Sequence, residues 1–215
     1  MLTFTDHERA RIHEAVRRAE QRTTGEIVPM IVPSSARYRE AGYRMGLILG
    51  WLTLALLLTI EMYWLPWGWH AGNAGWLLLG VIAAYGLGEW LGRFPVVIRL
   101  VTSRERMAYK VQLRAQQAFY QHGLQHTKGR TGILILVSLL EHRVQVLADK
   151  GINDCVPAGT WDEVVHGIIE GIKQGRPTDA ICDAIARCGE LLASRCPAES
   201  DDNPNELPDR LIQEP

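Results

Sequence analysis

Three acidic residues carry the most suggestive chemistry in the chain. Asp149 and Asp154 flank a loop that follows a predicted strand, and Glu26 begins another predicted strand. Carboxylate oxygens at strand ends are donors that Ca²⁺ and Mg²⁺ prefer, so these three residues are the candidate metal ligands. Two carboxylates make an incomplete shell, however, and Lys150 between them opposes a cation. A solvated loop is therefore the interpretation we favour, and whether Glu26 joins the pair depends on the fold.

Other residue patterns offer less chemistry. His122 and His126 have the spacing that places two imidazoles on one helical face, but Gly123 between them predicts the end of that helix. The sequence has no Gly-x-Ser-x-Gly nucleophile motif, and residues 129–132 lack the Lys-Ser/Thr ending of a phosphate-binding loop. Cys155 has no evident base. The absence of a nucleophile–base pair leans against an enzyme.

The elements that position these residues form an α/β domain. Capping-box patterns, such as Thr5 with Glu8, and apolar residues at helical spacing predict helices over about residues 5–22, 103–122, 160–174 and 178–196. Short apolar runs predict strands over 26–32, 131–138 and 144–148, the last two as an antiparallel hairpin. Pro29 inside the first strand predicts an edge or a bulge. The result is a small mixed sheet flanked by helices.

An apolar segment from Tyr43 to Gly92 interrupts this domain. Its halves, about residues 45–65 and 75–92, are each long enough to cross a hydrocarbon core of about 30 Å. Residues 45–88 contain one formally charged side chain, Glu61. A buried hairpin in a soluble protein would need one polar face, and neither half has one. The sequence therefore predicts a two-helix transmembrane hairpin, with the lipid bilayer as a partner.

Basic residues flank this hairpin and are absent from its connecting loop, residues 66–74. The positive-inside rule then places both termini in the cytoplasm and the loop on the outer side of the inner (cytoplasmic) membrane. The flanking arginines are Arg37, Arg39, Arg44, Arg93, Arg99, Arg104 and Arg106. The apolar stretch 94–101 is too short to span and is expected to lie at the inner interface.

Small residues recur along both predicted spans, and such stripes let helix backbones approach closely in lipid. They are Gly46, Gly50, Gly80, Ala84, Gly88 and Gly92. Two uses remain open. Gly46 and Gly50 can meet Gly88 and Gly92 within one hairpin, or the stripe can join two copies in a homo-oligomer.

Charge, cysteine content and domain limits complete the prediction. The net charge of −1 over 215 residues argues against a dedicated nucleic-acid binder. The four cysteines have no CxxC spacing, which indicates reduced thiols. We expect the domain in two parts, residues 1–40 and 103–196, around the hairpin at 43–92. Residues 197–215 are rich in Pro, Asp, Glu and Asn and are expected to be a disordered acidic tail.

Three segments, in this order, resemble the TPM domain, a family named for a thylakoid lumen protein, a photosystem II repair protein and an acetylcholine-receptor modulator. They are Thr24-Gly-Glu-Ile-Val28, Arg130-Thr-Gly-Ile-Leu-Ile-Leu-Val-Ser138 and His142-Arg-Val-Gln-Val-Leu-Ala-Asp-Lys-Gly-Ile152. The chain is most similar to a bacterial, membrane-inserted subgroup. The resemblance implies an α/β domain at a membrane.

The resemblance also implies an activity, because family members are labelled acid phosphatases with a divalent metal held by acidic loop residues. This chain has Gly129-Arg-Thr-Gly132 where many members carry an acidic residue followed by Asn-Gly, and Ala148-Asp-Lys-Gly-Ile152 where many have Gly-Tyr-Gly-Leu-Glu. Two functions are therefore weighed. The favoured one is a membrane-anchored, cytoplasm-facing accessory module that supports assembly or maintenance of membrane proteins. The alternative is a Ca²⁺- or Mg²⁺-dependent phosphatase at the membrane surface.

Overall fold

The computed structural model describes residues 4–21, 23, 25–64, 71–127, 130–154, 156–157, 159–195 and 211–213. The chain divides into two compact units. The first combines Met1–Ala36 with Ala108–Pro215, and the second is Arg37–Met107.

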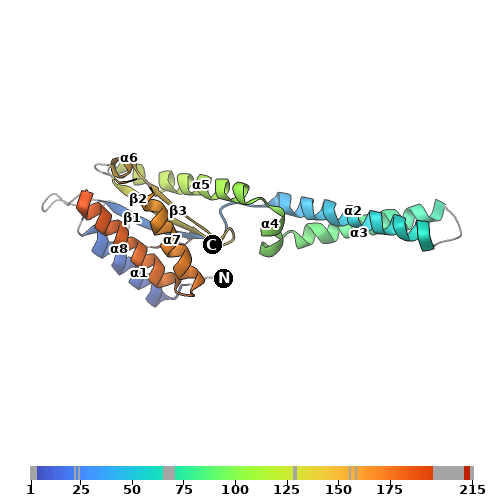
Figure 1. Ribbon diagram of the computed structural model, residues 1–215, viewed down its shortest axis with the longest axis horizontal. Helices are drawn as coiled ribbons and strands as arrows, with labels where there is room; N and C mark the ends of the chain where they lie inside the picture. Colours follow the sequence, from blue (N-terminus) through green and yellow to red (C-terminus); the bar gives the residue numbers. More distant parts are fainter. Residues whose placement is uncertain are drawn as a thin grey trace. The chain divides into compact units, whose positions relative to one another are not determined.

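The first unit is built on a four-stranded mixed sheet (Figure 1). The strands are β1 (Glu26–Val32), β2 (Gly132–Ser138), β3 (Arg143–Ala148) and β4 (Ile212–Gln213), in the order β3-β2-β1-β4. β1 is parallel to β2 and to β4, whereas β2 and β3 are antiparallel. Every residue of β1 and β2 is buried, which explains why both read as unbroken apolar runs. The predicted small mixed α/β sheet is confirmed.

Helices cover both faces of this sheet. One face carries α1 (Asp6–Glu20), α7 (Thr160–Lys173) and α8 (Pro177–Arg195), whose buried residues form one hydrophobic core with the strands. The opposite face packs against α5 (Arg104–Gln121) and the short helix η1 (Leu124–His126). The sheet is therefore the middle of three layers (Figure 1).

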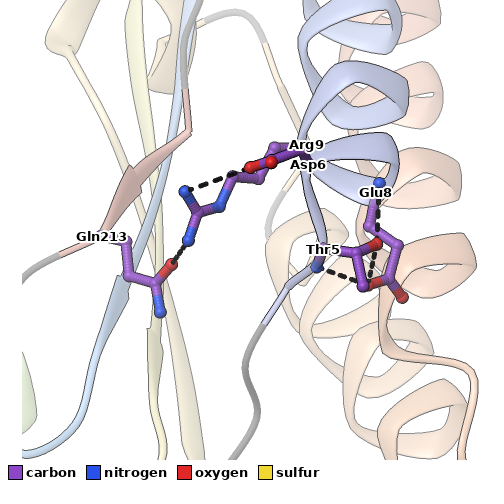
Figure 2. Close-up of polar contacts among 5 residues, drawn as sticks. All are labelled: Thr5, Asp6, Glu8, Arg9 and Gln213. Carbon is purple, nitrogen blue, oxygen red and sulfur yellow. Dashed lines mark hydrogen bonds and ion pairs between the residues drawn. The ribbon is translucent and has the colours of Figure 1, made fainter.

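The N-terminus of α1 shows how local sequence orients a helix in this unit. Thr5 is the N-cap, and its side chain and backbone exchange hydrogen bonds with Glu8 in a complete capping box (Figure 2). The other Glu8 oxygen accepts from the Thr178 hydroxyl at the start of α8, at 2.8 Å. The backbone hydrogen bond from Thr5, then the hydroxyl bonds, lower the pKa of Glu8. One carboxylate thus caps α1 and joins it to α8.

Two segments differ from the sequence prediction. The loop after β3 contains a single helical turn, α6 (Lys150–Asn153), because Asp149 caps it and Ile152 is buried beneath it. Within the predicted disordered tail, Leu211–Gln213 are ordered, and β4 pairs with β1. Disorder is therefore incorrect for these three residues. The other tail residues, 197–210 and 214–215, lie outside the described part of the chain.

The second unit contains two long helices, α2 (Arg39–Trp64) and α3 (Ala71–Leu91), followed by the short α4 (Pro95–Val101). Both long helices have the length and apolar composition needed to cross a membrane. Their large side chains remain exposed: Trp51 is 69% and Trp76 is 76% exposed. Neither helix therefore resembles the buried core helix of a soluble protein.

Glycines set the distance between α2 and α3. A Cβ atom added at Gly88 would lie 2.6 Å from the Cα of Gly46, and one added at Gly92 would lie 2.3 Å from the Cα of Gly42. A Cβ atom added at Gly50 would lie 3.8 Å from Val81 Cγ1, which is an ordinary contact distance. The expected glycine contact within one hairpin is therefore present, with Gly42 in place of Gly50 opposite the stripe. Homo-oligomerisation through small residues stays a prediction.

We predict that Gly88→Ala destabilises the hairpin, because the new methyl group would clash with the backbone of α2. Gly86→Ala is the matched control on the same helix, where an added Cβ meets nothing within 4 Å. Alanine favours a helix over glycine by about 1 kcal/mol, so the control should gain stability. Thermal unfolding in detergent should give a lower midpoint for Gly88→Ala and an equal or higher one for Gly86→Ala. Equal midpoints for both variants would contradict the close contact.

Candidate functional site

Two of the three predicted metal ligands lie at the same end of the sheet. Glu26 begins β1 and pairs with Gly132, the first residue of β2. The Asp149 backbone N–H, directly after β3, donates to the carbonyl oxygen of the same Gly132 at 2.9 Å. Glu26 and Asp149 thus stand on strands that flank β2, one on either side of Gly132. The parallel register of β1 with β2 creates this proximity.

Asp149 is shaped by the helical turn that it starts. Its Oδ1 accepts from the Lys150 backbone N–H at 2.6 Å, and its Oδ2 is buried with no hydrogen-bond partner in the described part of the chain. Asn153 closes the turn by donating to the Ala148 carbonyl at 2.7 Å, and it accepts from the Trp161 ring N–H at 3.0 Å. The turn is therefore held to both β3 and α7, and one carboxylate oxygen remains available to a ligand.

The third candidate, Asp154, follows this turn as the C-cap of α6 and is exposed, whereas Glu26 is only 4% exposed. Among the described residues, no three or more His, Cys, Asp or Glu side chains gather closely enough to hold a metal ion. Calcium takes six to eight oxygen ligands, so the donors that can be described do not complete a shell. The metal site at Glu26, Asp149 and Asp154 stays a prediction.

The remaining candidate side chains do not form a reactive group. α5 ends at Gln121, and Gly123 adopts a left-handed φ of 73°, so His122 and His126 do not share one helical face. Burial raises the pKa of the Cys188 thiol to about 12, and burial also raises that of Cys182, so both stay protonated at neutral pH. Cys155 lies outside the described residues.

A buried polar cluster that the sequence analysis missed lies at the opposite end of the sheet. Glu141, 6% exposed, accepts from the Ser138 hydroxyl at 2.5 Å and from the Ser35 backbone N–H at 2.9 Å. The Ser35 hydroxyl donates to Ser138 Oγ at 2.7 Å. Ser138 is 1% exposed, so no substrate reaches it. The cluster ties the segment after β1 to the β2–β3 turn and serves the fold rather than a reaction.

Comparisons with known proteins bear on the identity of this unit. Residues 94–191 match the family model of the TPM domain. Residues 94–191 are therefore similar to the TPM domain, and we use that name for the first unit. The matched segment runs from α4 to α8, and its part from Ala108 onward belongs to the same unit as α1 and β1.

A solved structure has a fold similar to that of this chain. The NMR structure of BA42 protein, from the psychrophilic bacterium Bizionia argentinensis, is similar to this chain with a TM-score of 0.61 and 21% sequence identity. The similarity covers 99% of this chain and 97% of that one. At this identity the likeness is one of fold. No curated protein matches the chain.

We predict weak calcium binding at the Glu26–Asp149 end of the sheet, because two carboxylates supply fewer oxygens than a full calcium shell needs. With a Kd on the order of 1 mM, addition of 1 mM Ca²⁺ would stabilise the protein by about 0.4 kcal/mol. Thermal unfolding should show a small midpoint increase that is absent from Asp149→Asn. Equal increases in both proteins would refute the site.

We also predict that Glu141→Ala destabilises the TPM domain, because it leaves the buried Ser35 N–H and Ser138 hydroxyl without their acceptor. The expected loss is about 2–3 kcal/mol of unfolding free energy. The exposed Glu190 on α8 provides a control, Glu190→Ala, which should change stability by less than about 0.5 kcal/mol. Urea unfolding in detergent measures both, and similar midpoints would show that the cluster contributes little.

Proposed function

We propose that this chain is a membrane-anchored accessory module whose TPM domain faces the cytoplasm and contacts other membrane proteins during their assembly or maintenance. The observation that carries this proposal is the exposure of the large apolar side chains of α2 and α3. Monomeric soluble proteins rarely expose contiguous apolar surface of this extent. A lipid bilayer is the environment in which two such helices are stable.

The exposed side chains lie on both long helices along most of their length. They include Leu47, Ile48, Trp51, Leu52, Leu56, Leu58, Ile60, Met62 and Tyr63 on α2, and Trp76, Leu78, Leu79, Ile82, Leu87 and Trp90 on α3. Glycines supply the contact between the helices, so the bulky side chains are left to face outward. This division of roles is typical of membrane helices, where small residues pack and large ones meet lipid.

The charges around the hairpin support its orientation. Arginines concentrate between residue 37 and the first turns of α2 and again just after α3, whereas residues 65–70 between these helices contain no Lys or Arg. Two of these arginines connect different helices within the unit: Arg44 donates to the Val101 carbonyl at 3.0 Å, and Arg106 pairs with Glu40 at 2.5 Å. Both contacts join the start of α2 to the region of α4 and α5. They support a common, cytoplasmic side for the two flanks.

α4 extends this interfacial region. It exposes Val96 (70%) and Leu100 (80%), and it carries a basic residue, Arg99, between them. An exposed apolar surface beside basic residues fits the headgroup layer of an anionic leaflet.

An accessory role is favoured over catalysis by the side chains of the TPM domain. In the described part of the chain, the hydroxyl–carboxylate cluster of Ser138 and Glu141 is buried, and the described cysteines are protonated. The buried Asp149 Oδ2 is the observation that favours the alternative, a metal-dependent phosphatase at the membrane surface. Turnover of a generic phosphate ester by the purified chain with Ca²⁺ or Mg²⁺, and its loss in Asp149→Asn, would favour that alternative.

We predict that both termini are cytoplasmic and that the α2–α3 connection is on the outer side of the inner membrane. Alkaline phosphatase fused at Asn73 should be active, and green fluorescent protein fused after Pro197 should fluoresce. The exchanged reporters serve as controls and should be silent. The reverse pattern would contradict the orientation, and recovery of the chain in the soluble fraction would contradict the anchor.

A further inference from the structure

The outer edge of β1 is occupied by the chain's own C-terminal segment. β4 runs parallel to β1, with Ile212 opposite Met30 and Gln213 opposite Ile31. Among the described residues these two pairs form, whereas β1 and β2 pair over seven residues on the other side. The C-terminal segment, residues 211–213, therefore covers a small part of the edge.

The remainder of this edge offers few main-chain donors to a further strand. Because the Glu26 N–H is directed to β2, the alternate residues Ile27, Pro29 and Ile31 direct their main-chain groups to the outer edge. The Ile27 N–H is already bound by the Glu20 carboxylate at 2.8 Å, and Pro29 has no N–H to donate. Among the described residues of β1, the end near Ile31 is therefore the part of this edge best suited to a strand, and this is where β4 binds.

Side chains of the C-terminal segment use three separate contacts. Leu211 packs on the core shared with α1, α7 and α8, and Ile212 packs on the core shared with α5, so adjacent residues fill opposite faces of the sheet. The Gln213 Oε1 accepts from the Arg9 guanidinium on α1 at 3.1 Å (Figure 2). Two adjacent aliphatic residues followed by a hydrogen-bond acceptor thus match this edge.

We propose that the end of β1 at Met30 and Ile31 is a docking edge for a short extended peptide, and that residues 211–213 occupy it as an internal ligand. The partner is an extended segment of another protein with two adjacent aliphatic side chains followed by an acceptor for Arg9. It adds to the sheet as a parallel strand in place of β4. Main-chain pairing supplies affinity in such strand addition, and side-chain pockets supply specificity.

The size of the internal ligand makes this exchange feasible. Residues 211–213 contribute two pairs with β1, Leu211 and Ile212 are only half-buried, and Gln213 is exposed. A tethered segment nevertheless competes strongly, because a short tether holds it at an effective concentration on the order of millimolar. In the intact chain, residues 211–213 therefore exclude weak ligands from the β1 edge. A partner that binds more tightly, or that is itself held nearby at the membrane, displaces them.

The inference rests on the interaction role proposed above and assigns its surface. Its test requires no membrane, so the two can fail separately. The probe is a dye-labelled peptide with the sequence of residues 210–215, and binding is read by fluorescence anisotropy in detergent. The protein is the full chain, compared with a chain that ends at Arg210.

The truncated chain should bind the peptide, and the full chain should bind it at least about tenfold more weakly because its own segment competes. A peptide with Ile212→Asp should bind the truncated chain at least about tenfold more weakly, because the substitution places a charge against the core shared with α5. Arg9→Ala in the truncated chain should weaken binding about fivefold, the effect of one lost hydrogen bond. Arg18→Ala, farther along α1, is the matched control and should leave binding unchanged.

If truncation unfolds the protein, the full-length variant Ile212→Asp opens the edge without shortening the chain, and circular dichroism verifies its fold. No peptide binding by a folded, opened protein would overturn the proposal. Equal binding by the intact and opened proteins would overturn the role of residues 211–213 as an internal ligand. A full-length dimer that truncation converts to monomer would assign the edge to a second copy's tail and would overturn a foreign partner.

Discussion

The parallel pairing of β1 with β2 is the constraint on which the TPM domain depends. Seven residue pairs, from Glu26 with Gly132 to Val32 with Ser138, join two segments separated by about a hundred residues. Parallel strands require a long crossover, and here the whole second unit lies within it. Without this pairing, α1 and β1 would lose the core against which they pack. The edge of β2 that now pairs with β1 would then be exposed.

The same pairing determines what each end of the sheet can do. At one end it places Glu26 and Asp149 on either side of Gly132, which brings candidate ligands together. At the other end it places Ser35 beside Ser138 and Glu141, whose hydrogen bonds satisfy buried polar groups. The two ends carry similar residue types with opposite consequences. At the first, the Asp149 Oδ2 has no hydrogen bond among the described residues, whereas at the second the Glu141 carboxylate accepts bonds that close the fold.

The two units solve the burial of apolar residues in different ways. In the TPM domain the sheet is covered on both faces, and the large side chains of β1 and β2 are buried. In the second unit, glycines such as Gly46 and Gly88 bring α2 and α3 into backbone contact, and the large side chains face outward. The first arrangement excludes water from its core. The second requires surroundings as apolar as the side chains themselves, which is why we propose a bilayer.

Much of this architecture follows from local sequence. Short stretches of sequence are enough to predict the capping box at Thr5 and Glu8, the apolar runs of β1 and β2, and the long apolar helices α2 and α3. Caps, periodicity and span length are local properties. Pro29 likewise predicted an edge or a bulge in β1. The described pairs between β4 and β1, at Met30 and Ile31, lie beyond this proline. Tertiary structure alone decided which segments meet. A strand as short as Ile212–Gln213 has no periodicity and exists because β1 offers it an edge. Ser35 and Ser138 are 103 residues apart, so no local pattern connects them. The proximity of Glu26 to Asp149 depends on strand register, which is set by packing on both faces of the sheet and not by the residues themselves.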